Sequence, residues 1–102
     1  MKGVKAFLRK KEEIISAIFD IIELQNSELI LADTRQGKIH FQVTMYGFVW
    51  ELLYIILDDG TGTCEVSHRV IGERKDKARE IRRQFALLDM MLSGGADVEM
   101  SE

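Results

Sequence analysis

The sequence predicts an α+β domain in which a helix, a four-stranded antiparallel β-meander and a second helix follow one another (α-β-β-β-β-α), with both helices packed on one face of the sheet. Two segments near the ends of the chain carry apolar residues at three- and four-residue spacing, which is typical of amphipathic helices. Between them, apolar and polar residues alternate in short runs separated by glycine-containing turns. A length of 102 residues suits one domain with one core.

The first helix is expected over residues 7–25. Its apolar stripe is wider than a surface helix requires and consists of Ile14, Ile15, Ile18, Phe19, Ile21, Ile22 and Leu24. Asn26 and Ser27 favour an end to the helix, because their side chains compete for backbone hydrogen bonds.

Two strands are expected next, over residues 28–33 and 38–45, joined by a turn in which Gly37 adopts a positive φ at little cost. The second of these strands alternates strictly. Its apolar row is Ile39, Phe41, Val43 and Met45, and its polar row is Lys38, His40, Gln42 and Thr44. Such alternation predicts a strand with one face in the core and one face in solvent.

The third strand, over residues 48–57, is apolar on both faces. A two-residue turn at Tyr46-Gly47 would place Met45 opposite Phe48, so that the apolar rows of the two strands share the core face. The core row would then be Phe48, Trp50, Leu52, Tyr54 and Ile56, and the second row Val49, Glu51, Leu53, Ile55 and Leu57. A sheet covered on one side needs only one apolar row per strand, so the second row is surplus.

The fourth strand is expected over residues 63–71, after a loop at residues 58–62. An odd loop, such as a type I turn with a glycine bulge, would turn Cys64, Val66 and His68 towards the core, and we expect this arrangement. An even loop would place the same residues on the opposite face. The second helix is expected from Glu73 to about Leu92, with a stop at residues 93–95. The domain would therefore span residues 1–95, and the acidic residues 96–102 would form a disordered tail.

Composition indicates a cytoplasmic protein. The net charge of −3 is mild, and a single cysteine, Cys64, excludes an intrachain disulfide and fits a reducing compartment. The first residues do not resemble a secretory signal, and the longest apolar runs fall short of the roughly 20 residues that span a bilayer. Basic residues of the second helix alternate with acidic ones, which favours solvated helix faces over nucleic-acid binding.

Few residues suggest chemistry. The loop Asp58-Asp59-Gly60-Thr61-Gly62 lacks the lysine and the following helix of a phosphate loop, so we interpret it as a turn. His40, Glu51 and His68 could bind zinc only if the loop were even. We therefore expect no catalytic residue, cofactor or metal site, and we lean towards a protein that is not an enzyme.

The surplus row leads to the functional prediction. An exposed apolar stripe usually marks an interface or a ligand groove. We expect a small interaction module that forms a homodimer through the outer face of its sheet, with an interface consisting of Val49, Glu51, Leu53, Ile55, Leu57 and His40. Two alternatives remain: binding of another protein, or of an apolar small molecule held between sheet and helices. A third arrangement, with one helix on each face, would hide the row within the monomer.

The expected order of elements is similar to that of several small α+β domains, including cystatin-like and START-like ligand-binding folds. This is a similarity of architecture, and no motif in the chain assigns a role to particular residues. START-like domains usually have more strands and a longer chain.

Overall fold

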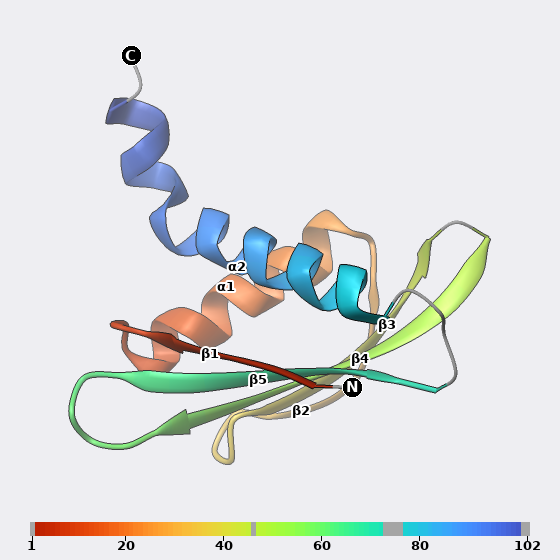
Figure 1. Cartoon of the computed structure of the whole chain (residues 1–102), viewed down its shortest axis with the longest axis horizontal. Helices are drawn as coiled ribbons and strands as arrows, with labels where there is room; N and C mark the ends of the chain where they lie inside the picture. The colour runs from red at the N-terminus through yellow and green to blue at the C-terminus, as the bar shows by residue number, and fades with distance from the viewer. Residues whose placement is uncertain (1, 46, 73–76, 101–102) are drawn as a thin grey trace.

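The fold is a five-stranded antiparallel sheet that carries two helices on one of its faces (Figure 1). The computed structural model describes residues 2–45, 47–72 and 77–100, with side chains up to Leu92. In chain order the elements are β1 (Lys2–Phe7), α1 (Lys11–Leu24), β2 (Glu28–Asp33), β3 (Lys38–Met45), β4 (Phe48–Asp58), β5 (Cys64–Ile71) and α2 (Lys77–Met100). The strands lie in the order β1-β5-β4-β3-β2. The predicted α+β class and antiparallel sheet are confirmed.

The prediction of four strands and a helix-first order was wrong, because the chain begins with a strand. β1 pairs antiparallel with β5, from Lys2 opposite Arg69 to Phe7 opposite Cys64. Only Phe7 of this strand is buried, so β1 lacks the apolar alternation that reveals a half-buried strand. The first helix accordingly begins at Lys11 rather than at residue 7.

The predicted register of β3 and β4 is confirmed. Met45 lies opposite Phe48, Phe41 opposite Leu52, and Ile39 opposite Tyr54, as a two-residue connection requires. Of the two turn residues, Gly47 has a φ of 79°, while Tyr46 lies outside the described residues.

The odd parity of the second hairpin loop is also confirmed. Asp58 pairs with Cys64 and Tyr54 pairs with His68, so the loop comprises residues 59–63 and His68 shares the core face with Tyr54. Cys64 is buried, as a small core residue would be.

The core lies between the sheet and the two helices. It is built from Ile14, Ile18 and Ile21 of α1 and from most residues of the apolar rows of β3, β4 and β5. Met45 is only partly buried, and the prediction of Phe48 as a core residue was wrong, because this side chain lies at the first position of β4, next to the turn, and is 57% exposed. The helix α2 approaches β1 closely at Gly3, where an added Cβ would lie 2.4 Å from Ile81 Cγ2. A residue without a side chain is therefore needed at this crossing.

The helix α2 runs through Ser93, Gly94 and Gly95 to Met100, so the glycines expected to end it lie within its backbone. Its expected start at Glu73 lies outside the described residues, and the division of the chain at residue 95 stays a prediction. Among the described residues, neither helix combines the length and the apolar character that crossing a bilayer requires.

Candidate functional site

The outer face of the sheet, away from both helices, carries the surplus apolar row of β4. Strand pairing adds apolar residues of β5 and β1 to this face: Ile71 of β5 lies opposite Glu51, and Val4 of β1 lies opposite Ser67, which is itself opposite Ile55. We call these apolar positions the outer apolar stripe, which consists of Val4, Val49, Leu53, Ile55, Leu57 and Ile71. On β5, the polar residues Glu65, Ser67 and Arg69 lie opposite Leu57, Ile55 and Leu53.

This stripe is accessible. Val4, Val49 and Leu57 are 50%, 48% and 53% exposed, while Leu53 and Ile55 are half-buried. Leu53 and Ile55 help to line a shallow hollow of about 120 Å³, together with Lys2, Ser67 and Arg69. Since both helices lie on the opposite face (Figure 1), the arrangement with one helix on each face is excluded.

Polar residues surround the stripe. His40 Nε2 lies 3.0 Å from Glu51 Oε2, which is a diagonal contact between β3 and β4. His68 lies on the other face, so His40, Glu51 and His68 do not come together. Over residues 2–45, 47–72 and 77–100, no group of three or more histidine, cysteine, aspartate or glutamate side chains is placed to hold a metal ion.

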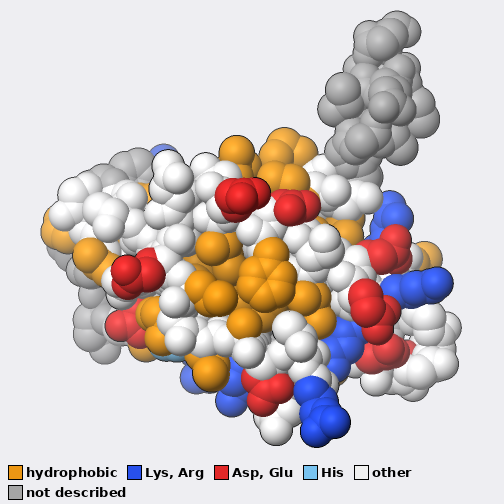
Figure 2. Space-filling view, turned by 180° about the vertical axis from the view of Figure 1, so that it is seen from behind, with side chains coloured by type: hydrophobic (Ala, Val, Ile, Leu, Met, Phe, Trp, Pro, Cys, Tyr) orange, Lys and Arg blue, Asp and Glu red, His pale blue; other side chains and the backbone are white. Residues whose placement is uncertain are grey.

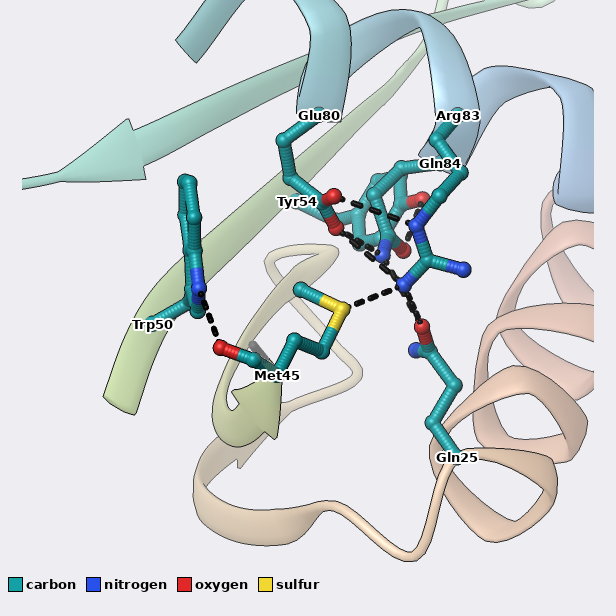
Figure 3. A network of polar contacts seen from close by, with 7 residues as sticks. All are labelled: Gln25, Met45, Trp50, Tyr54, Glu80, Arg83 and Gln84. Carbon is teal, nitrogen blue, oxygen red and sulfur yellow. Dashed lines mark hydrogen bonds and ion pairs between the residues drawn. The ribbon is translucent and has the colours of Figure 1, made fainter. Parts of the chain in front are cut away.

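The inner side of the sheet holds a polar network that the sequence did not reveal (Figure 3). The Tyr54 hydroxyl donates to Gln84 Oε1 at 3.2 Å. The Gln84 amide in turn donates to Glu80 Oε2 at 2.7 Å and to Gln25 Oε1 at 3.2 Å. Arg83 Nε donates to Glu80 Oε1 at 3.1 Å. The network therefore links β4, α2 and the end of α1 through side chains.

Two ionisable side chains of this network, Glu80 and Tyr54, are buried. Glu80 is only 3% exposed, and its ion pair with Arg83 compensates part of its desolvation. Burial, and secondarily the Glu80 carboxylate, raise the pKa of Tyr54, so its hydroxyl remains a donor throughout the physiological range.

His68 is the most unusual buried residue. It is fully buried, with its ring centroid 4.3 Å from that of Tyr54 and 6.1 Å from that of Phe85. Within the described residues, neither ring nitrogen of His68 has a hydrogen-bond partner. Two effects act on the pKa of His68: burial lowers it, and the Leu53 backbone raises it. Burial dominates and lowers the pKa of His68 to about 3, so the ring is neutral.

The sequence interpretation placed Glu80, with the other charged residues of the second helix, on a solvated face, and it made no prediction for Gln84. The sequence did contain a sign that these two residues are buried. Glu80, Gln84 and Leu88 are spaced by four residues and so lie on one face of the helix, and Leu88 belongs to its apolar stripe. A polar residue in line with a core residue is a candidate for a buried network.

Fold and surface together define a small α+β domain with one helix-covered sheet face and one accessible, partly apolar face. No family model matches the chain, and no curated protein is similar to it in sequence. Among solved structures, it is similar to the crystal structure of Ara h 8.0201, with a TM-score of 0.42 and 9% identity over 92% of this chain and 94% of that chain. This similarity is too distant to indicate a function, so the functional proposal rests on the residues of this chain.

Proposed function

We propose that this protein is a small interaction module that self-associates through the outer face of its sheet. One observation carries the proposal: four side chains of the outer apolar stripe are 36–53% exposed on a face over which no helix lies. These side chains are Val4, Val49, Leu57 and Ile71. Accessible apolar side chains gathered on one face of a sheet favour an interface.

The charges around the stripe suit a second copy of the chain. Basic Lys2, Lys38 and Arg69 lie on the same face as acidic Glu51 and Glu65. In a two-fold dimer each face meets its own copy, so a face of one sign would repel itself. A face that carries both signs avoids this repulsion.

The expected dimer is weak. Full burial of an apolar side chain contributes about 1.5–3 kcal/mol, so a half-exposed one contributes about 1 kcal/mol. Six such residues in each copy give about 12 kcal/mol before the cost of association. If association costs about 7 kcal/mol, roughly 5 kcal/mol remains, and the Kd is on the order of 100 µM.

Sedimentation equilibrium at several concentrations tests the proposal. We expect a monomer–dimer equilibrium that Leu57→Lys abolishes, because the substitution replaces an apolar contact at the interface with a charge that must be desolvated. The matched control is Leu24→Lys, which removes a leucine that is 58% exposed at the end of α1. A wild-type protein that stays monomeric at about ten times the expected Kd, or a Leu57→Lys variant that dimerises normally, would refute self-association through this face.

A second candidate function is the binding of an apolar small molecule between sheet and helices. The observation that favours it is His68, a buried polar side chain whose two ring nitrogens lack a partner among the described residues. Unpartnered buried polar atoms are costly and call for an explanation, of which a ligand with a hydrogen-bonding group is one. Native mass spectrometry of gently purified protein tests this candidate: a retained mass that disappears in His68→Phe supports it, and the bare chain mass alone contradicts it.

A further inference from the structure

The edge of the sheet formed by β2 is apolar and accessible. β2 pairs only with β3 in the sheet order, and its three central apolar residues, Leu29, Ile30 and Leu31, are 45%, 46% and 50% exposed. An edge strand presents backbone N–H and C=O groups that can pair with another chain. β2 carries no charge between its end residues Glu28 and Asp33, and its pairing with β3 is shifted by a bulge between Leu29 and Leu31.

A groove lies between α1 and the turn that follows β2. Its volume is about 610 Å³, and its lining combines Ile15 and Phe19 of α1 with Ser16, Thr34 and four charged residues, Lys11, Glu12, Asp20 and Arg35. Ile15 and Phe19 are only partly buried against the core. In Figure 1 α1 and β2 lie at the back of the molecule, and Figure 2, seen from behind, shows hydrophobic side chains gathered in the middle of this side. The groove therefore borders the end of β2, and its apolar part is formed by Ile15 and Phe19.

The two faces of β2 determine what an added strand would meet. Leu29 lies opposite Phe41 on the core side, whereas Glu28, Leu31 and Asp33 lie on the outer side, opposite Gln42, His40 and Lys38. Since side chains alternate along a strand, every second residue of an added strand would lie on the side of the sheet that carries the helices. Its other side chains would lie on the outer side, next to Leu31 and between the two carboxylates.

The carboxylates at the two ends of β2, Glu28 and Asp33, favour some added strands over others. If β2 paired antiparallel with β2 of a second copy, Glu28 of one chain would lie opposite Asp33 of the other, and like charges directly opposite each other destabilise a sheet. A strand with basic residues at those positions would gain attraction at both ends instead. We propose that β2 accepts, by β-strand addition, an extended segment of a different protein that is apolar at its centre and basic at its two ends.

A binding assay with defined peptides tests this proposal on the whole chain. The probe is a fluorescein-labelled peptide of alternating valine and threonine with lysine at each end, and the comparison peptide carries glutamate at each end. We expect saturable binding of the lysine-ended peptide, followed by fluorescence anisotropy. The glutamate-ended peptide should bind about fivefold more weakly or worse, because both end contacts become repulsive.

Two variants assign the binding to β2. Ile30→Lys places a charge on the exposed edge and should weaken binding at least about tenfold. The double variant Glu28→Lys/Asp33→Lys should reverse the preference, so that the glutamate-ended peptide binds better; a reversal cannot come from unfolding. Leu57→Lys, on the outer face, should leave peptide binding unchanged and so separates this site from the proposed dimer interface.

Three results would overturn the proposal: no binding of either peptide, equal binding of both, or an unchanged affinity in a folded Ile30→Lys variant. Sedimentation of Ile30→Lys supplies a further check. If this variant, rather than Leu57→Lys, converts a wild-type dimer into a monomer, then β2 is occupied by a second copy and the proposed heterologous partner is wrong.

Discussion

Protonation of His68 should destabilise this protein well above the pH at which carboxylates titrate. In the folded state burial holds the pKa of His68 at about 3, whereas in the unfolded chain it takes the ordinary value of about 6.5. As the pH falls from about 6.5 to about 3, the unfolded state binds a proton that the folded state does not. The free energy of unfolding therefore decreases over this window, and the stability that neutral His68 provides is present only above it.

The magnitude follows from the two pKa values. Each pKa unit of difference is worth about 1.36 kcal/mol, so the full loss approaches about 5 kcal/mol near pH 3. Between about pH 7 and about pH 5 the expected loss is about 2 kcal/mol. Because His68 is fully buried, solvent screening does not reduce this value much.

Urea unfolding followed by circular dichroism, at about pH 7 and about pH 5, measures the effect. His68→Phe keeps an aromatic ring beside Tyr54 but cannot titrate, so it should lose about 2 kcal/mol less than the wild type over this interval. His40→Gln serves as a control that removes the other histidine and keeps His68, and it should retain the wild-type loss. If the wild type and His68→Phe differ by less than about 0.5 kcal/mol in their pH dependence, His68 is not buried as a neutral ring, and the reasoning fails.

Three substitutions test the packing and the buried network by the same unfolding measurement. Gly3→Ala should cost about 1–3 kcal/mol, because the added methyl would displace Ile81 from its position on β1, and an unchanged stability would contradict the close crossing of α2 and β1. Tyr54→Phe should lower the free energy of unfolding by about 1 kcal/mol, because Gln84 Oε1 loses its donor. An unchanged free energy of unfolding would show that this hydrogen bond does not contribute. Glu80→Ala should cost about 3 kcal/mol or more, since it leaves its buried partners without a carboxylate, and a loss below about 1 kcal/mol would show that the network contributes little.

Particular residues show why some predictions succeeded. The alternation of Ile39, Phe41 and Val43 specifies which face of β3 is buried, and the two-residue turn transmits that choice to β4. The same reasoning placed His68 in the core, because only an odd loop lets β5 continue the apolar face. Both inferences rest on neighbours along the chain, for which hydrophobic pattern and turn length are sufficient.

The strand β1 and the buried network depend instead on contacts between distant parts of the chain. Lys2 pairs with Arg69 and Tyr54 bonds to Gln84, so each partnership joins segments far apart in the sequence. A strand at the edge of a sheet can form through backbone hydrogen bonds with little apolar patterning, which is why the segment before Lys11 did not look like one. Glu80 looked like a surface residue because charged residues are rarely buried without a partner, and its partners become visible only in three dimensions.

The surplus apolar row of β4 was evident from the sequence alone, because alternate residues of a strand lie on opposite faces and the residues of each face can be listed. Only the tertiary structure decided that both helices lie on the other face and that this row, extended by Val4 and Ile71, is left accessible. The physical reason is that periodicity reports which residues share a face, whereas the element that covers a face is chosen by packing between distant parts of the chain. The same packing leaves β2 at the edge of the sheet, which no local pattern indicated.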